Sequence, residues 1–139
     1  MSFLLDTNVL SELRRGLQAD RNVLAWDHAV DETERFTSIL VIAELMKGAQ
    51  LRSRRDVGGS AVLEQWIGRI IEEFAHRILT VDITVSSIWA RLMAQRARPP
   101  IDMLIAATAI AHGYHLVTRN VADFDGTGVQ LINPWTYES

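Results

Sequence analysis

The 139-residue sequence contains no cysteine and only one lysine, Lys47. The lack of cysteine excludes disulfides, thiolate zinc sites and cysteine nucleophiles, and it fits a reducing compartment. No apolar stretch is long enough to span a bilayer. The apolar start of the chain is too short for a signal peptide and lacks its basic leader. We therefore expect a soluble, cytoplasmic protein that does not enter a membrane.

An excess of positive charge is also lacking, because the formal net charge is −3. A protein that binds nucleic acid through bulk charge would be basic, so any such contact here must depend on local features. The basic residues are nearly all arginines, which suit bidentate contact with phosphate, although the codon usage of a GC-rich genome would give the same bias. The length and the absence of repeats or linkers predict a single domain over residues 1–139.

Short apolar segments alternate with longer segments of helical periodicity. The expected strands cover residues 2–5, 35–37, 78–81, 115–118 and 129–132. The expected helices cover residues 9–15, 20–30, 38–51, about 63–74, about 85–92 and 101–112, with a polar, glycine-ended loop at 52–59. This alternation predicts right-handed βαβ units, and hence an α/β fold with a parallel sheet between two layers of helices.

Four acidic residues follow the expected strands or lie on the helices after them: Asp6, Glu44, Asp102 and Asp123. In an open α/β sheet, ligands bind at the carboxyl ends of the strands, so acids from four distant segments can meet there.

Each acid also has a purely structural interpretation. Asp6 and Asp102 could cap or favourably charge the first turn of a helix, and Asp123 could belong to an Asx turn. Glu44 could form an ion pair with Lys47 on a solvent-exposed face of its helix.

Glu44 shares its helical face with Leu40, Val41, Gly48 and Leu51. On such an apolar stripe a glutamate is costly to bury unless a lysine or a metal ion meets it.

A set of clustered carboxylates suits Mg²⁺ or Mn²⁺, which prefer oxygen ligands. The ion would relieve the repulsion between the carboxylates and lower the pKa of a bound water for attack on phosphorus. This chemistry requires neither a cysteine nor a serine–histidine pair.

Four blocks of sequence, followed by the ending Leu131–Trp135, carry a family resemblance: Leu4–Leu10, Ser38–Leu45, Asp102–Ala109 and Val117–Phe124. In this order they resemble the PIN domain, and in particular the VapC- and FitB-type toxins of bacterial toxin–antitoxin pairs. The resemblance covers essentially the whole chain. It implies a three-layer α/β/α sandwich with about five parallel strands, a homodimer, and Mg²⁺- or Mn²⁺-dependent cleavage of RNA, often transfer RNA.

The resemblance also implies a cognate VapB/FitA-like antitoxin. Its tail would inhibit the site and its other end would bind DNA, so this chain would meet DNA only indirectly.

The same resemblance assigns roles to single residues. Asp6 and Asp102 match the acids usually assigned to the metal, and Glu44 matches the acid on the helix after the second strand. The last acid of the family can fall at Asn120 or Asp123, and we favour Asp123. The expected catalytic residues are Asp6, Glu44, Asp102 and Asp123, and the expected substrate-binding residues are Asn8, Thr118, Arg119 and Asn120.

Other functions fit the sequence less well. Phosphotransfer enzymes and receivers with an aspartate after the first strand need a lysine late in the chain, and only Lys47 is present. No glycine-rich loop ends in Lys-Ser or Lys-Thr, and the four histidines lack the spacing of a zinc site. The main alternative is a catalytically silent PIN scaffold that binds a protein or RNA.

Overall fold

The computed structural model describes residues 1–139 as one five-stranded parallel sheet in the order β3-β2-β1-β4-β5. The strands are β1 (Phe3–Leu5), β2 (Arg35–Ser38), β3 (Ile78–Leu79), β4 (His115–Val117) and β5 (Leu131–Ile132). The helices are α1 (Thr7–Leu13), α2 (Arg21–Ala29), α3 (Ile39–Ser53), α4 (Val57–Glu73), α5 (Ile83–Gln95) and α6 (Pro100–His112). This confirms the expected three-layer α/β/α sandwich with a parallel sheet.

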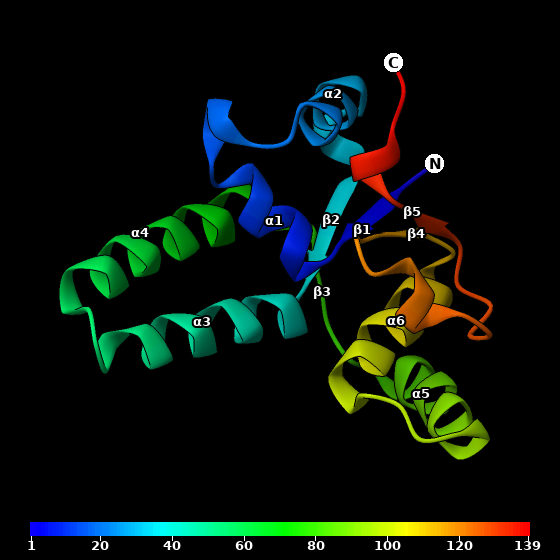
Figure 1. The fold of residues 1–139 in the computed structure, drawn as a ribbon. Helices are drawn as coiled ribbons and strands as arrows, with labels where there is room; N and C mark the ends of the chain where they lie inside the picture. Colours follow the sequence, from blue (N-terminus) through cyan, green and yellow to red (C-terminus); the bar gives the residue numbers. More distant parts are fainter.

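The order of the strands decides where a ligand can bind. The chain steps from β1 to β2 and β3 in one direction, and β4 then returns to the other side of β1. Right-handed crossovers therefore place α1 and α2 on one face and α5 and α6 on the other, as Figure 1 shows. The α3–α4 pair extends away from the sheet as a hairpin (Figure 1). The direction reverses between β1 and β4, and their carboxyl ends are where α/β proteins bind ligands.

The core supports this edge of the sheet. Leu4, Leu5, Leu116 and Val117 are at most 1% exposed, because the two central strands are covered on both faces. The middle of helix α6 is largely buried, from Met103 to Ala109, with Ile105 at 0% exposure. This buried segment anchors the helix whose first turn carries Asp102. None of the helices is both long and apolar enough to cross a membrane.

Several element boundaries differ from those expected, and two of them are set by helix caps. The first helix begins at Thr7 and not at residue 9, because Asp6 serves as its N-cap. The loop expected over 52–59 ends earlier than predicted, because α4 already begins at Val57 and includes both glycines. Asp56 caps α4 by accepting a hydrogen bond from the Gly59 N–H at 2.8 Å. A Cβ at Gly59 would lie 2.2 Å from the Asp56 carboxylate, so any other residue here would force the capping side chain to shift.

The outer strands are shorter than expected. Strand β3 covers only residues 78–79 and β5 only 131–132, because each pairs with a single neighbour over two residues. Ser38 caps α3, as expected, by accepting hydrogen bonds from the Leu40 and Val41 N–H groups.

Candidate active site

Asp6 lies directly after β1 and is only 5% exposed. One carboxylate oxygen accepts a hydrogen bond from the Thr7 N–H at 2.8 Å, and the other accepts one from the Thr118 hydroxyl at 2.9 Å. Asp6 is thus both the cap of α1 and a buried acid at the carboxyl edge of the sheet. The expected role of Asp6 as a helix cap is therefore correct, and it is compatible with a place in the acidic cluster.

A network of hydrogen bonds holds Asp6 in place. The buried Thr118 hydroxyl oxygen accepts hydrogen bonds from the Asn8 side-chain amide and from the Asn120 N–H, both at 3.2 Å. The Asn8 side-chain oxygen Oδ1 in turn accepts a hydrogen bond from the Arg119 backbone N–H at 3.2 Å. The four expected substrate-binding residues therefore lie together beside Asp6. Thr118 and Asn8 are engaged within the protein, while the Arg119 and Asn120 side chains are exposed.

Glu44 lies half-buried on α3, and its carboxylate accepts a hydrogen bond from the Thr7 hydroxyl at 2.8 Å. The interpretation of its face as a buried apolar stripe is wrong. The buried face of α3 consists of Val41, Ile42, Leu45 and Ala49. Glu44 instead lies at the margin of that face and lines an open groove of about 570 Å³ together with Lys47, with which it forms no ion pair. Leu51, which also lines this groove, remains 47% exposed.

Asp102 and Asp123 complete the cluster from the other side. Asp102 lies half-buried in the first turn of α6, and Asp123 is exposed on the short 3-10 helix Val121–Phe124. The structure places the charge of Asp123 close enough to raise the pKa of Asp102. Asn120 instead donates its backbone N–H to Thr118. Of the two candidates for the fourth acidic position, only Asp123 brings a second negative charge to Asp102.

The carboxylates are electrostatically coupled. Burial raises the pKa of Asp6 from 3.8 to about 6, and the charges of Asp102 and Glu44 add to this, although the hydrogen bonds from Thr7 and Thr118 lower it. Burial also raises the pKa of Asp102, with further contributions from Glu44 and Asp123. None of the four acids forms an ion pair with an arginine, lysine or histidine. The edge of the sheet therefore carries concentrated negative charge that no protein cation neutralises.

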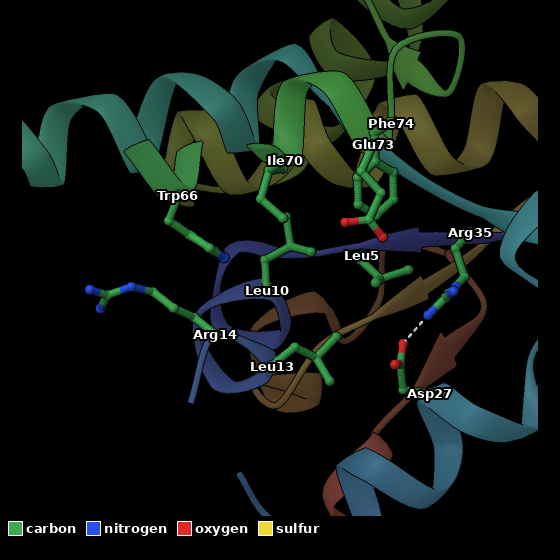
Figure 2. Close-up of a pocket in the computed structure, with 10 residues that line it drawn as sticks. All are labelled: Leu5, Leu10, Leu13, Arg14, Asp27, Arg35, Trp66, Ile70, Glu73 and Phe74. Atoms are coloured by element: carbon green, nitrogen blue, oxygen red, sulfur yellow. Dashed lines mark hydrogen bonds and ion pairs between the residues drawn. The ribbon is translucent and has the colours of Figure 1, made fainter. Parts of the chain in front are cut away.

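A second hollow lies apart from this cluster. It has a volume of about 160 Å³ and is lined by residues of α1 and α4, among them Leu10, Trp66 and Ile70. Figure 2 shows the Arg35–Asp27 ion pair at one end of it and Arg14 at the other. It contains none of the expected site residues, so the acidic cluster is the better candidate for chemistry.

Sequence reasoning missed two contacts of the site. The hydrogen bond between the Thr7 hydroxyl and Glu44, which lie 37 residues apart in the chain, was not predicted. Sequence reasoning also did not predict that the Arg119 guanidinium lies over the Trp135 ring, 5.1 Å from the ring centroid. No local pattern signals either contact, because both depend on how distant segments pack.

Comparison with known proteins agrees with this geometry. The family model of the PIN domain matches residues 3–128. The chain is 37% identical to the VapC ribonuclease of Sinorhizobium fredii, over 95% of this chain and 96% of the relative. Among solved structures, it matches the FitAB complex bound to a DNA fragment with a TM-score of 0.84 and 31% identity, covering 99% and 98% of the two chains. A toxin–antitoxin complex from Klebsiella pneumoniae matches with a TM-score of 0.73 and 26% identity, over 99% and 100% of the chains. The chain therefore belongs to the PIN-domain family, and its similarity lies with the VapC- and FitB-type members.

Proposed function

We propose that this chain is a metal-dependent endoribonuclease and the toxin of a type II toxin–antitoxin pair. The observation that carries the proposal is the cluster of Asp6, Glu44, Asp102 and Asp123, in which neighbouring carboxylates add to the raised pKa values of Asp6 and Asp102 and no protein cation forms an ion pair. A site of this kind favours a divalent cation and phosphate chemistry over acid–base chemistry with a histidine. The similarity to a VapC ribonuclease supports RNA as the substrate.

The donor set of the cluster fits Mg²⁺ or Mn²⁺. All its charged donors are carboxylate oxygens, which these hard cations prefer. No three acidic or histidine side chains lie together as a ready metal site, so the protein would supply only one or two carboxylates to an Mg²⁺ ion, whose other ligands would be water or phosphate. Asp6 and Asp102 would hold the ion, which when bound supplies a more acidic water and neutralises charge on phosphate.

The protein's own residues orient this site. Thr118 and the Thr7 N–H fix the two oxygens of Asp6, and the Thr7 hydroxyl fixes Glu44 from the same turn of α1. Asp102 is held by helix α6, whose middle is buried. Because the charges of Glu44 and Asp123 both act on Asp102, they would favour a cation bound there. Carboxylates at such positions can also accept a proton from an attacking water.

The exposed Arg119 and Asn120 side chains are proposed to contact the RNA, with Asn8 and Thr118 supporting the loop that carries them. The overall charge of −3 requires such local contacts.

We further propose a VapB/FitA-like antitoxin as the partner, supported by the similarity to toxin–antitoxin complexes, one of them bound to DNA. DNA would be reached only through that antitoxin, and two copies of the chain would form the toxin. A small upstream reading frame whose product co-purifies with this chain and stops its activity is the expected result. A partner that binds but leaves cleavage unchanged would contradict the inhibitory role.

Cleavage of a total RNA pool by the purified protein tests the enzymatic proposal. We expect cleavage with Mg²⁺ or Mn²⁺, its loss with a chelator, and its loss in Asp6→Asn and Asp102→Asn, which keep the size of each side chain. Asp31→Asn serves as a control, since Asp31 caps a turn at the opposite edge of the sheet. Full cleavage in both site variants would refute the mechanism. No cleavage of any RNA, with no metal bound in calorimetry, would favour the silent scaffold.

A further inference from the structure

Two of the four tryptophans carry a stacked arginine, and one of these stacks lies at the candidate active site. The Arg119 guanidinium lies 5.1 Å from the centroid of the Trp135 ring. The other pair, Arg14 and Trp66, lies 5.7 Å apart beside the hollow between α1 and α4 (Figure 2). The two pairs have the same chemistry but different neighbours.

Trp135 is anchored through its backbone and packs against the core. Its backbone N–H donates to the Asn133 side chain at 3.0 Å, and its backbone carbonyl accepts a hydrogen bond from the Asn22 side chain of α2 at 2.7 Å. The side chain is half-buried against core residues, and the Arg119 guanidinium lies over its ring. Stacking on a fixed ring restricts the rotamers of an otherwise flexible arginine.

A chain of hydrogen bonds connects the backbone of Arg119 to Asp6. Its N–H donates to Asn8, the Asn8 amide donates to Thr118, and the Thr118 hydroxyl donates to Asp6. The guanidinium is exposed and forms no ion pair, although four carboxylates lie at the same edge of the sheet. A contact with the ring face uses none of the guanidinium N–H donors, and the side chain forms no hydrogen bond within the protein, so these donors remain available for bidentate contact with phosphate.

We propose that Arg119 binds a phosphate of the RNA strand beside the carboxylate cluster, and that Trp135 is the positioning residue that holds its guanidinium for this contact. The inference rests on the proposed function, since it names how the substrate of that site is held. A cation fixed before the RNA arrives loses less side-chain entropy on binding. It also offsets the repulsion between phosphate and carboxylates at this edge.

A double-mutant cycle in the full chain tests the proposal. Binding of a fluorescent single-stranded RNA is measured by anisotropy in the Asp6→Asn background, with Mg²⁺ present, so that cleavage does not interfere. The variants are Arg119→Gln, Trp135→Leu and their combination. Trp135→Phe keeps an aromatic face, and Arg14→Gln with Trp66→Leu forms the matched control. Melting temperatures are recorded for every variant.

We expect Arg119→Gln to weaken binding about tenfold, the loss of one charged hydrogen-bonded contact. It should also reduce the slope of log K against log salt by about 0.7, the value for one phosphate of a single strand. Trp135→Leu should weaken binding about two- to fivefold, Trp135→Phe should restore most of this, and Trp135→Leu should add nothing once Arg119 is absent. The Arg14 and Trp66 variants should bind as the parent does.

Several results would overturn the inference. Additive losses from Arg119→Gln and Trp135→Leu would show that the tryptophan acts through stability and not through the arginine. An equal loss in Arg14→Gln would show that any surface charge suffices. Unchanged RNA binding in Arg119→Gln would show that Arg119 does not contact the RNA, and the Arg119–Trp135 pair would then be assigned to binding of a partner protein. Absence of RNA binding in every variant would instead refute the proposed function, so the two failures can be told apart.

Discussion

Replacing Asp6 with asparagine removes a buried charge while keeping the shape of the side chain, and it should stabilise the metal-free protein at neutral pH. The Asp6 carboxylate is 5% exposed, and its two hydrogen bonds come from neutral donors. Asparagine keeps an oxygen that can cap α1. The variant therefore isolates the cost of carrying a negative charge next to Asp102 and Glu44.

The magnitude and the sign follow from the pKa of Asp6. This pKa is raised from 3.8 to about 6 in the folded protein, and each pKa unit corresponds to about 1.4 kcal/mol. Between these values the folded state holds more of the proton than the unfolded state. The free energy of unfolding of the parent therefore falls as pH rises through this window and is constant above it. The variant lacks this loss, so it should gain about 3 kcal/mol relative to the parent between pH 4 and pH 7.

Urea unfolding from pH 4 to pH 8 in a chelating buffer measures this gain. Asp31→Asn is an informative control because the hydrogen bonds from Thr33 lower the pKa of Asp31. Its effect has the opposite sign, since the charged Asp31 stabilises the fold above the unfolded pKa and this stabilisation is lost as pH falls. Mg²⁺ at a hundred times its dissociation constant should stabilise the parent by about 2.7 kcal/mol and the Asp6 variant far less.

A stability difference between parent and Asp6→Asn that stays constant from pH 4 to pH 8 would refute this reasoning. It would mean that the carboxylate remains hydrated in the folded protein or is neutralised by another group. Equal stabilisation of both proteins by Mg²⁺ would show that Asp6 does not help to hold the ion.

Two further predictions concern the surroundings of the site and the α3–α4 hairpin. Thr118→Val removes the hydroxyl that lowers the pKa of Asp6. It should reduce the free energy of unfolding by about 1–2 kcal/mol at pH 8, and by less at pH 5, where Asp6 takes up a proton. An equal reduction at both pH values in urea unfolding would contradict this. Gly59→Ala should lower the melting temperature, because the new Cβ would lie 2.2 Å from the Asp56 carboxylate. Gly58→Ala, whose Cβ would lie 3.8 Å from that carboxylate, should leave the melting temperature unchanged or raise it. Equal effects of the two variants in thermal melts would show that the Asp56 cap adapts freely.

The sequence alone predicted the order and type of the main elements. Apolar periodicity and capping residues are local signals, so Ser38 at the start of α3 and the strand that places Asp6 were both recognised. It also indicated the edge of the sheet at which the acids gather, because the carboxyl ends of parallel strands share one edge. The ends of α1, α4 and the outer strands were less well predicted, since caps and strand pairing partners decide them.

Tertiary structure alone decided how the acidic cluster is assembled. Glu44 is held by Thr7 and Arg119 stacks on Trp135, and both contacts join segments that no local pattern connects. The charge of Asp123 acts on Asp102 from a short 3-10 helix whose path no local pattern predicts. The sequence determined which four carboxylates end near the carboxyl edge of the sheet. Packing determined how deeply each is buried, and burial is the main cause of the raised pKa of Asp6.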